Sequence, residues 1–589
     1  MFRNPGSAFH RCAVLCLFLC VSGLQATVPT VTPADRKAWI EGSSAHFRFF
    51  SSVSPAATRA VSQDFETLRE VVRQMTSGPE RGGPATQDPV PSYVYLFNQE
   101  STFNPYRDQK WVGGWCSPRP DGNYIALRMD IEHVERTVFH EYLHQFLHQH
   151  FPNIPTWLDE GMAELYSTMT TDGNKVRLGS PDKNRFITIQ TLQLMSVRQL
   201  LSENAPIHGS SDSMQVDRFY AGSWLLVHYL MLGNMERSRQ LRTFMRMLAE
   251  GVPPKDAFPK AFLGLSETLD AELHEYLAQI LARHSIPIRV LTLDSLAVDG
   301  TFSSHPIPLD QVHGRLGLLT LSLSRLSEDF ANLARAHFKA AESINPACAT
   351  AQFGQGIQLL QAANRSEAIP YLMKAAEGAP DDPMIQILAG KTISAHNMGY
   401  TARPDTLSPD LVLAREYLLR SQKQPPFQLD VMKLISQLYA LDINRLEESV
   451  SFQEKAILAY PNEPDFPFWL GVTHLARNDR EKALPLLNQV AGKFWGTPRG
   501  REAKQQLNDL EEQDLRAMVT QAVQLANSGK PSEALLMLEA AQQRAIQINS
   551  APLQQRIQNV LMQVRNLVSE SASASMKRPT TASSRKKNR

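Results

Sequence analysis

The residues of this chain best suited to chemistry are two histidines and a glutamate in the segment His140-Glu141-Tyr142-Leu143-His144. On an α-helix, side chains four positions apart lie on one face, so His140 and His144 can offer ring nitrogens to one metal ion. Glu141 projects to the side of that pair and can reach a water molecule held by the metal. Two imidazoles with an adjacent carboxylate are the ligands and general base of a zinc hydrolase.

A catalytic zinc ion needs a third protein ligand and keeps one coordination position open. The segment Trp157-Leu158-Asp159-Glu160-Gly161 starts a second expected helix, which makes Glu160 the first candidate. The alternative is an amphipathic helix with solvated histidines. Apolar residues surround the histidines, however, and Pro152 and Pro155 end the first helix cleanly. The sequence therefore predicts one catalytic Zn²⁺ ion, held by the histidine pair and Glu160.

The motifs HEYLH and WLDEGMAELY together resemble those of the gluzincin metallopeptidases, in particular the peptidase-MA-like domains of bacterial secreted proteins. The resemblance covers roughly residues 44–280 and implies an α+β fold with the same three zinc ligands and Glu141 as the base. Apolar segments fit this order, with strands expected at 46–50, 93–97 and 124–128 and a helix at 55–75. In that fold a sheet edge lies above the zinc and pairs with extended substrate, and residues 122–128 would be this edge.

Two further residues gain roles only through the resemblance. Glu164 lies one helical turn after Glu160, where an acid commonly holds a ligand histidine from the second shell. A rival assignment makes Glu164 the ligand, but the Glu-Gly pair at Glu160 matches the family motif. Tyr220 lies about as far beyond the ligand glutamate as the oxyanion-stabilising tyrosine of clan aminopeptidases. Because its segment is apolar, the other interpretation is a core tyrosine, and His228 is a weaker catalytic candidate.

One departure from the family pattern bears on activity. Clan aminopeptidases have a Gly-x-Met-Glu-Asn segment that binds the free amine of the substrate. The nearest glycine-rich stretch here, Gly113-Gly114-Trp115, lacks that glutamate. We therefore expect an endopeptidase that acts on a peptide or protein substrate. The competing function is a protein-binding scaffold whose zinc domain is inactive or weakly active.

Charge and cysteine content exclude several classes. The chain has 589 residues, with 60 Lys or Arg and 59 Asp or Glu. Basic residues concentrate at the two ends, so the folded part is mildly acidic and gives no support for nucleic-acid binding. Residues 1–26 have the pattern of a secretory signal, and their apolar run, Cys12 to Val21, is about half the length that a membrane span requires. The alternative is that the segment is kept as an anchor. We expect an exported bacterial protein, periplasmic or extracellular, with no later membrane span. Only Cys116 and Cys348 follow the signal, which argues against a disulfide-built protein.

The expected fold is multidomain, with an α+β gluzincin-like domain at 27–285 followed by an all-α tetratricopeptide solenoid at 311–566. Pro-rich residues 286–310 are interpreted as an extended linker. The solenoid is expected because Ala334, Ala341 and Pro346 recur 34 residues later, the tetratricopeptide period. Such a solenoid would fold separately and bind a substrate or a protein partner. The basic tail at 567–589 is expected to be disordered.

Overall fold

We describe the protein from a computed structural model that covers residues 39–576, except for short segments at 78–90, 109–111, 120–121, 132–133, 152, 203–212, 263–265, 284, 297, 299, 399–404 and 424–428. The expected signal at 1–26 and the end of the tail at 577–589 lie outside the described residues. None of the described helices combines the length and apolar character that crossing a membrane requires. The chain forms two compact units, and the first reaches Met398 and includes Leu413–Val431. Each unit is described by itself.

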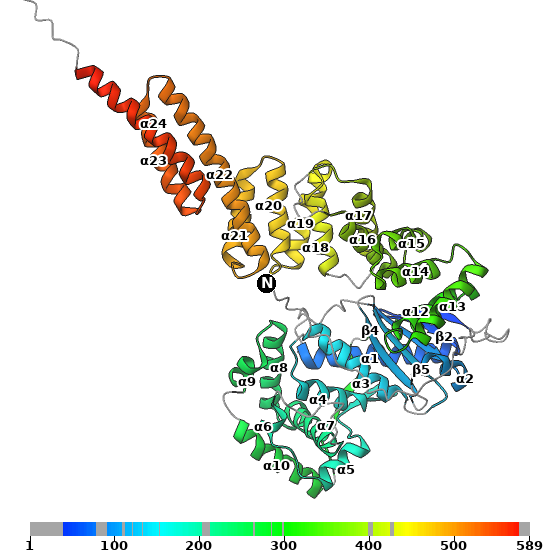
Figure 1. Ribbon diagram of the computed structural model, residues 1–589. Helices are drawn as coiled ribbons and strands as arrows, with labels where there is room; N and C mark the ends of the chain where they lie inside the picture. Colours follow the sequence, from blue (N-terminus) through cyan, green and yellow to red (C-terminus); the bar gives the residue numbers. More distant parts are fainter. Residues whose placement is uncertain are drawn as a thin grey trace, which may run out of the picture. The chain divides into compact units, whose positions relative to one another are not determined.

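A six-stranded sheet organises the first unit (Figure 1). Its strand order is β4-β5-β3-β2-β1-β9. Strands β2, β3 and β5 are parallel neighbours, β4 pairs antiparallel with β5, and β1 pairs antiparallel with β2 and β9. This arrangement confirms the three strands expected from the sequence. The strands are β1 (Ile40–Ser43), β2 (Phe47–Ser51), β3 (Ser92–Phe97), β4 (Gly114–Arg119), β5 (Gly122–Arg128) and β9 (Ser303–Pro306).

The segment 286–310, expected to be a linker, belongs to the first unit, so that prediction is wrong. Strand β9 closes the edge of the main sheet beside β1. Strand β8 (Arg289–Thr292) joins a three-stranded sheet with β6 (Thr170–Asp172) and β7 (Lys175–Leu178). All four side chains of β9 are exposed, so backbone pairing holds the strand and leaves no alternating apolar pattern in the sequence. The short helix α11 (Leu293–Leu296) buries Leu296 completely.

The two faces of the main sheet are covered by different parts of the chain. On one face, Phe47 and Ile125 belong to a core shared with α1 (Pro55–Ser77) and α3 (Val134–His150). On the other face, aromatic side chains of β2, β3 and β5 pack against α12 (Leu309–Ser322) and α13 (Glu328–Ile344). These aromatic residues are Phe50, Tyr93, Tyr95, Phe97 and Tyr124. The first repeat helices are therefore a layer of the first unit, and no separate domain begins at residue 311.

A buried ionic cluster joins the sheet to these repeat helices. Asp382 Oδ2 accepts hydrogen bonds from Arg48 of β2 and Arg315 of α12, each at 2.9 Å. Asp382 also caps α16 (Pro383–Asn397) through the backbone N–H groups of its first turn. Burial opposes the charged carboxylate, but the two guanidinium groups outweigh it and hold the pKa of Asp382 below its usual range. Buried ion pairs between Asp382 and the two arginines thus link the sheet to the repeat helices.

The helices after α13 form successive layers in each unit, as a solenoid requires (Figure 1). The small residues that recur in the sequence lie where neighbouring helices approach closely. A Cβ atom at Gly356 would lie 2.6 Å from Leu372, and one at Gly390 would lie 2.6 Å from Leu418. In the first unit these helices are α14 (Ala349–Gln361), α15 (Arg365–Gly378), α16 and α17 (Pro409–Ser421).

Helices form nearly all the regular structure among the described residues of the second unit, together with one isolated β-bridge between Asp405 and Asp442. The last helix of this unit extends to Met576, so the expectation of disorder is wrong for residues 567–576. That segment continues an amphipathic helix, and adding residues to an existing helix is far easier than starting one. The helices are α18 (Leu429–Ala440), α19 (Leu446–Ala459), α20 (Asp465–Ala476), α21 (Arg480–Lys493), α22 (Pro498–Asn527), α23 (Pro531–Gln547) and α24 (Ala551–Met576).

We expect a fragment of residues 39–310 to aggregate or to lack a cooperative thermal transition. The aromatic face of its sheet would be exposed to water, and exposed apolar patches of this kind drive association. A fragment of residues 39–431 keeps the covering helices and should melt cooperatively in circular dichroism. A soluble, cooperatively melting 39–310 fragment would contradict this description of the first unit.

We expect Asp382→Asn to lower the free energy of unfolding at pH 7 by about 3–5 kcal/mol, because it leaves the buried Arg315 guanidinium without its counter-charge, while Arg48 keeps its ion pair with Glu41. The native pKa of Asp382 lies below the unfolded value of about 3.9. Its stabilisation is therefore complete above that pH and is lost as the pH falls towards the native pKa.

The difference in free energy of unfolding between wild type and Asp382→Asn, measured with urea, should consequently become smaller as the pH is lowered from 5 to 3. Asp514→Asn is the control, since the Arg480–Asp514 pair is well exposed and should contribute below about 1 kcal/mol. Equal losses in the two variants would show that the buried cluster has no special role.

Candidate metal centre

Three side chains from two helices meet at one point in the first unit. Helix α3 presents His140 and His144 one turn apart, and α4 (Thr156–Ser167) presents Glu160. The two Nε2 atoms are 3.1 Å apart, and Glu160 Oε2 is 3.4 Å from His144 Nε2 and 3.6 Å from His140 Nε2. Zinc–ligand distances of about 2.0–2.1 Å in a tetrahedron give ligand separations of about 3.3 Å. The three atoms therefore have the spacing of a zinc ligand set.

The state of Glu160 supports the same assignment. Its Oε2 atom is buried and makes no hydrogen bond, while Oε1 accepts one from the Tyr220 hydroxyl at 3.0 Å. Burial opposes ionisation, but the two histidines outweigh it and hold the pKa of Glu160 well below its usual range. A buried carboxylate oxygen without a partner is costly unless a cation compensates it. Oε2 thus faces both histidine ring nitrogens without a hydrogen bond, and a metal ion held by the three atoms would compensate its charge.

Asp159, and not Glu164, holds a ligand histidine, which corrects the role expected for Glu164. Asp159 Oδ1 lies 2.8 Å from His144 Nδ1, and its Oδ2 lies 2.7 Å from His148 Nε2. The Glu164 carboxylate makes no hydrogen bond or ion pair with either histidine and accepts a hydrogen bond from Arg185 at 2.9 Å. Sequence reasoning missed Asp159 and His148, although His148 continues the four-residue spacing of the histidines and Asp159 precedes the ligand glutamate.

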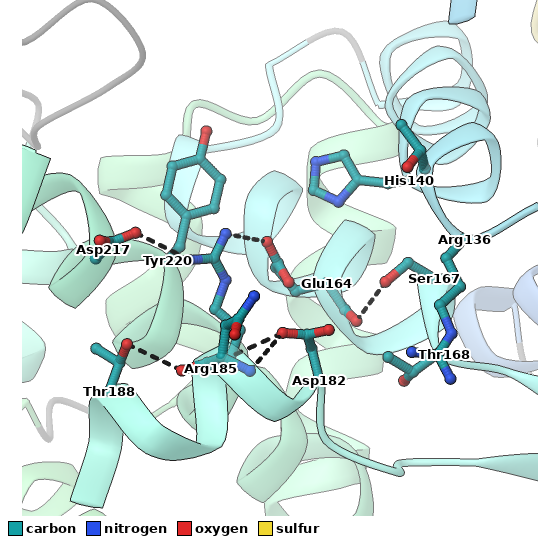
Figure 2. A pocket seen from close by; sticks show the side chains of 12 residues that line it. Arg136, His140, Glu164, Ser167, Thr168, Asp182, Arg185, Thr188, Asp217 and Tyr220 are labelled. Carbon is teal, nitrogen blue, oxygen red and sulfur yellow. Dashed lines mark hydrogen bonds and ion pairs between the residues drawn. The ribbon is translucent and has the colours of Figure 1, made fainter. Parts of the chain in front are cut away.

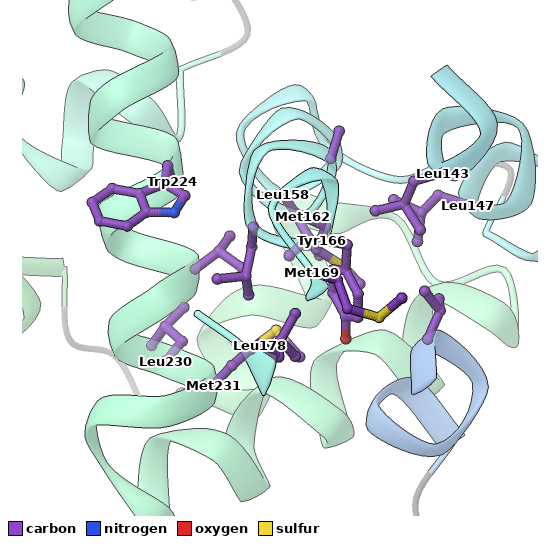
Figure 3. Packing of buried hydrophobic residues seen from close by; sticks show 14 of the residues in the cluster. Leu143, Leu147, Leu158, Met162, Tyr166, Met169, Leu178, Trp224, Leu230 and Met231 are labelled. Carbon is purple, nitrogen blue, oxygen red and sulfur yellow. The ribbon is translucent and has the colours of Figure 1, made fainter. Parts of the chain in front are cut away.

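Gly161 explains how the ligand helix meets the helix that carries Tyr220. A Cβ atom at Gly161 would lie 2.5 Å from the carbonyl oxygen of Ser223 on α7 (Ser213–His228), so only glycine allows this approach. Buried side chains of α3, α4 and α7 surround the contact (Figure 3). The close packing brings the Tyr220 hydroxyl to Glu160. His228, farther along α7, bonds to Gly179 and Tyr276 inside the core, so its role is structural.

A polar cavity of about 470 Å³ opens beside His140 and Tyr220 (Figure 2). Arg185, on α5 (Lys183–Thr191), stacks its guanidinium on the Tyr220 ring at 4.9 Å and pairs with Glu164 and with Asp217 at 3.2 Å. Burial and the charge of Glu160 raise the pKa of the Tyr220 phenol above its usual range. Tyr220 is therefore a neutral hydrogen-bond donor at physiological pH.

Glu141 lies on the side of α3 that faces strand β4. Burial raises the pKa of the Cys116 thiol on β4, and the negative charge of Glu141 raises it further, which places the two groups near one another. Among the described residues, none forms a hydrogen bond or ion pair with the Glu141 carboxylate. Glu141 is thus available as a proton acceptor beside the three candidate ligands.

The sheet edge nearest the site is β4, and the expectation that residues 122–128 form this edge is wrong. Those residues form β5, which is paired on both sides, with β4 and with β3. β4 has a sheet neighbour on one side only among the described strands. The sequence did not predict β4, because it contains Pro118 and proline is found in strands mainly at sheet edges, which cannot be recognised from the sequence alone.

Helices α5 to α10 complete this half of the first unit around α4. Besides α5 and α7 they are α6 (Val197–Leu200), α8 (Met235–Ala249), α9 (Pro254–Ala261) and α10 (Ser266–Arg283), with the turn η4 (Tyr229–Gly233) between α7 and α8. Two short elements, α2 (Glu100–Phe103) and η3 (Asn104–Tyr106), precede β4.

Comparison with known proteins places the site within a family domain. A family model described as Peptidase MA superfamily matches residues 73–278, which include all the candidate ligands. The chain therefore has a Peptidase MA superfamily domain followed by a mostly helical, solenoid-like region. No curated protein matches the chain.

Solved structures similar to the chain are helical-repeat proteins at low identity. One is YrrB, described as a TPR protein with an unusual peptide-binding site, with 21% identity over 29% of this chain and 81% of that one, and a TM-score of 0.24. Another is the human IFIT1 dimer with m7Gppp-AAAA, with 10% identity over 67% of this chain and 93% of that one, and a TM-score of 0.20.

We expect Asp159→Asn to weaken Zn²⁺ binding by about 10–100-fold, the usual effect of removing a carboxylate that orients a ligand histidine. Glu164→Gln should leave the affinity within about twofold, because Glu164 touches neither histidine. Competition with a chromophoric chelator measures both constants. The reverse order of effects would restore the role that the sequence suggested for Glu164.

Proposed function

We propose that this protein is a zinc-dependent endopeptidase. The observation that carries the proposal is the set of three candidate ligand atoms 3.1–3.6 Å apart, one of which is a buried Glu160 oxygen that makes no hydrogen bond. The Peptidase MA superfamily domain at residues 73–278 supports the same function. His140, His144 and Glu160 would hold the ion. Bound zinc would supply a water molecule of lowered pKa and polarise the carbonyl of the scissile bond.

The remaining catalytic work falls to Glu141 and Tyr220. Glu141 accepts a proton from the attacking water and delivers it to the leaving amine, since no described residue forms a hydrogen bond or ion pair with its carboxylate. Tyr220 stays protonated because its pKa is raised. Its hydroxyl, which donates to Glu160 in this structure, would donate instead to the substrate oxygen on which negative charge develops.

The substrate is proposed to bind as an extended strand along β4. A strand with an unpaired edge offers regularly spaced N–H and C=O groups to a peptide backbone. The segment Gly113-Gly114-Trp115 lies at the start of β4, and β4 contains no acidic residue that could bind a free amine. This favours cleavage within a chain over removal of its N-terminal residue.

Export and partner binding complete the proposal. The secretory pattern at 1–26 suggests that the enzyme acts in the periplasm or outside the cell. The helices of the second unit are proposed to bind a substrate or a protein partner, as stacked helical hairpins commonly do. The first repeat helices have a structural task, because they cover the sheet.

We expect Glu141→Gln to abolish peptide hydrolysis and to keep one zinc ion per chain, because it removes a base and leaves all three ligands. His144→Ala should lose both zinc and activity. Peptide-library digestion followed by mass spectrometry, together with elemental analysis, measures the two properties. Hydrolysis by the zinc-loaded Glu141→Gln protein at the wild-type rate would refute the assignment of the base, and a wild-type protein that binds zinc without cleaving any peptide would favour the scaffold function.

A further inference from the structure

The cavity beside the metal centre has an unusual lining for a pocket next to a peptidase site. Its described lining contains no aliphatic side chain, and Tyr220 is its single aromatic residue. An apolar substrate side chain would gain little there, since it would displace water from polar groups without replacing their hydrogen bonds. A substrate group that enters this cavity must therefore be polar or charged.

The described lining has three carboxylates and two guanidinium groups, and all but one of these charged groups have a partner of opposite sign among the described residues. Glu164 and Asp217 both pair with Arg185. Asp182 accepts from the backbone N–H groups of Asn184 and Arg185 and so caps α5. Each carboxylate thus already has a positive partner, either a guanidinium or a helix N-terminus.

Arg136 is the exception. It lies on α3 one turn before His140, and residues four apart on a helix have Cβ atoms about 6 Å from one another. Among the described residues, no carboxylate pairs with its guanidinium. Figure 2 shows Arg136 and Asp217 on opposite sides of the cavity, with Arg185 and Tyr220 on the side of Asp217. Across the cavity from the Arg185 pairs there is thus a guanidinium without a described carboxylate partner, carried by the helix that presents His140.

We infer that this cavity binds a substrate carboxylate next to the scissile bond, and that Arg136 recognises it. This inference rests on the proposed peptidase function and names its specificity. An arginine fork matches a carboxylate with two parallel hydrogen bonds. The carboxylate can come from an acidic side chain or from the C-terminus of the substrate, and the experiment below separates the two sources.

Two peptide series would test the inference on the full-length, zinc-loaded protein. The first uses C-terminally amidated peptides that have Glu, Gln or Lys at the residue next to the bond cleaved in a library digest. The second keeps Gln at that residue and ends the chain there, as a free acid or as an amide. We expect kcat/KM to be at least about tenfold higher for the carboxylate member of one series, the effect of one charge-assisted hydrogen bond.

Substitutions at Arg136 should alter that preference specifically. Arg136→Gln should reduce it to about twofold or less, and Arg136→Glu should reverse it in favour of Lys. Arg239→Gln is the control, because Arg239 is an exposed arginine on α8 outside the cavity. Preference for Glu supports recognition of a side chain, and preference for the free acid supports recognition of a C-terminus and would change the proposed enzyme to one that trims C-termini. Equal rates across both series, or a preference that survives Arg136→Gln, would overturn the inference.

A binding measurement separates this inference from the proposed function. Fluorescein-labelled versions of both peptide series, with random flanking residues, are titrated into the zinc-loaded Glu141→Gln protein and followed by anisotropy. Carboxylate-selective binding that disappears with Arg136→Gln supports the inference even if no variant hydrolyses peptides. Identical affinities for the acidic, neutral and basic members overturn it even if the wild type proves to be a peptidase.

Discussion

The whole first unit depends on one constraint, which is that the central sheet is apolar on both faces. Strands β2, β3 and β5 direct phenylalanines and aliphatic residues to one side and tyrosines and phenylalanines to the other. One side is covered by α3, which presents the two histidines. The other side is covered by α12 and α13, which the sequence assigns to the repeat domain. The candidate metal centre is well supported, because its helix α3 packs on a sheet whose opposite face is covered by α12 and α13.

The same logic of close packing sets the geometry within the centre. Gly161 lets α4 and α7 approach until Tyr220 reaches the ligand carboxylate, and Asp159 fixes the ring of His144 from the opposite flank. Arg185 then holds the Tyr220 ring by stacking on it. His144 and Tyr220 are therefore each positioned by a neighbour with no proposed part in the chemistry, an arrangement that lowers the reorganisation needed during a reaction.

Much of this could be predicted from the sequence where the signal is local. The ligand trio follows from helix periodicity and one paired motif, and the repeats follow from recurring small residues. Most of the errors share a physical origin, because they concern how separate segments pair or pack; the exception is residues 567–576, where an existing helix continues. Strand β9 has four exposed side chains and no pattern, yet it pairs with β1 across more than half of the unit. The sequence favoured Glu164 over Asp159 as the partner of a histidine, because residue spacing shows which residues share a helix face but not how α3 and α4 are inclined to one another.

The position of β9 at the far edge of the sheet has a consequence for synthesis. Its partner, β1, is made near the start of the chain, and the helices that cover the aromatic face are made after β9. The sheet cannot be closed or shielded until roughly the first half of the polypeptide has emerged. Such long-range closure slows folding and leaves apolar surface exposed in the meantime. The nascent chain therefore carries its histidine pair for a long interval before the supporting sheet is closed, so the candidate metal centre is completed only after the first repeat helices have been made.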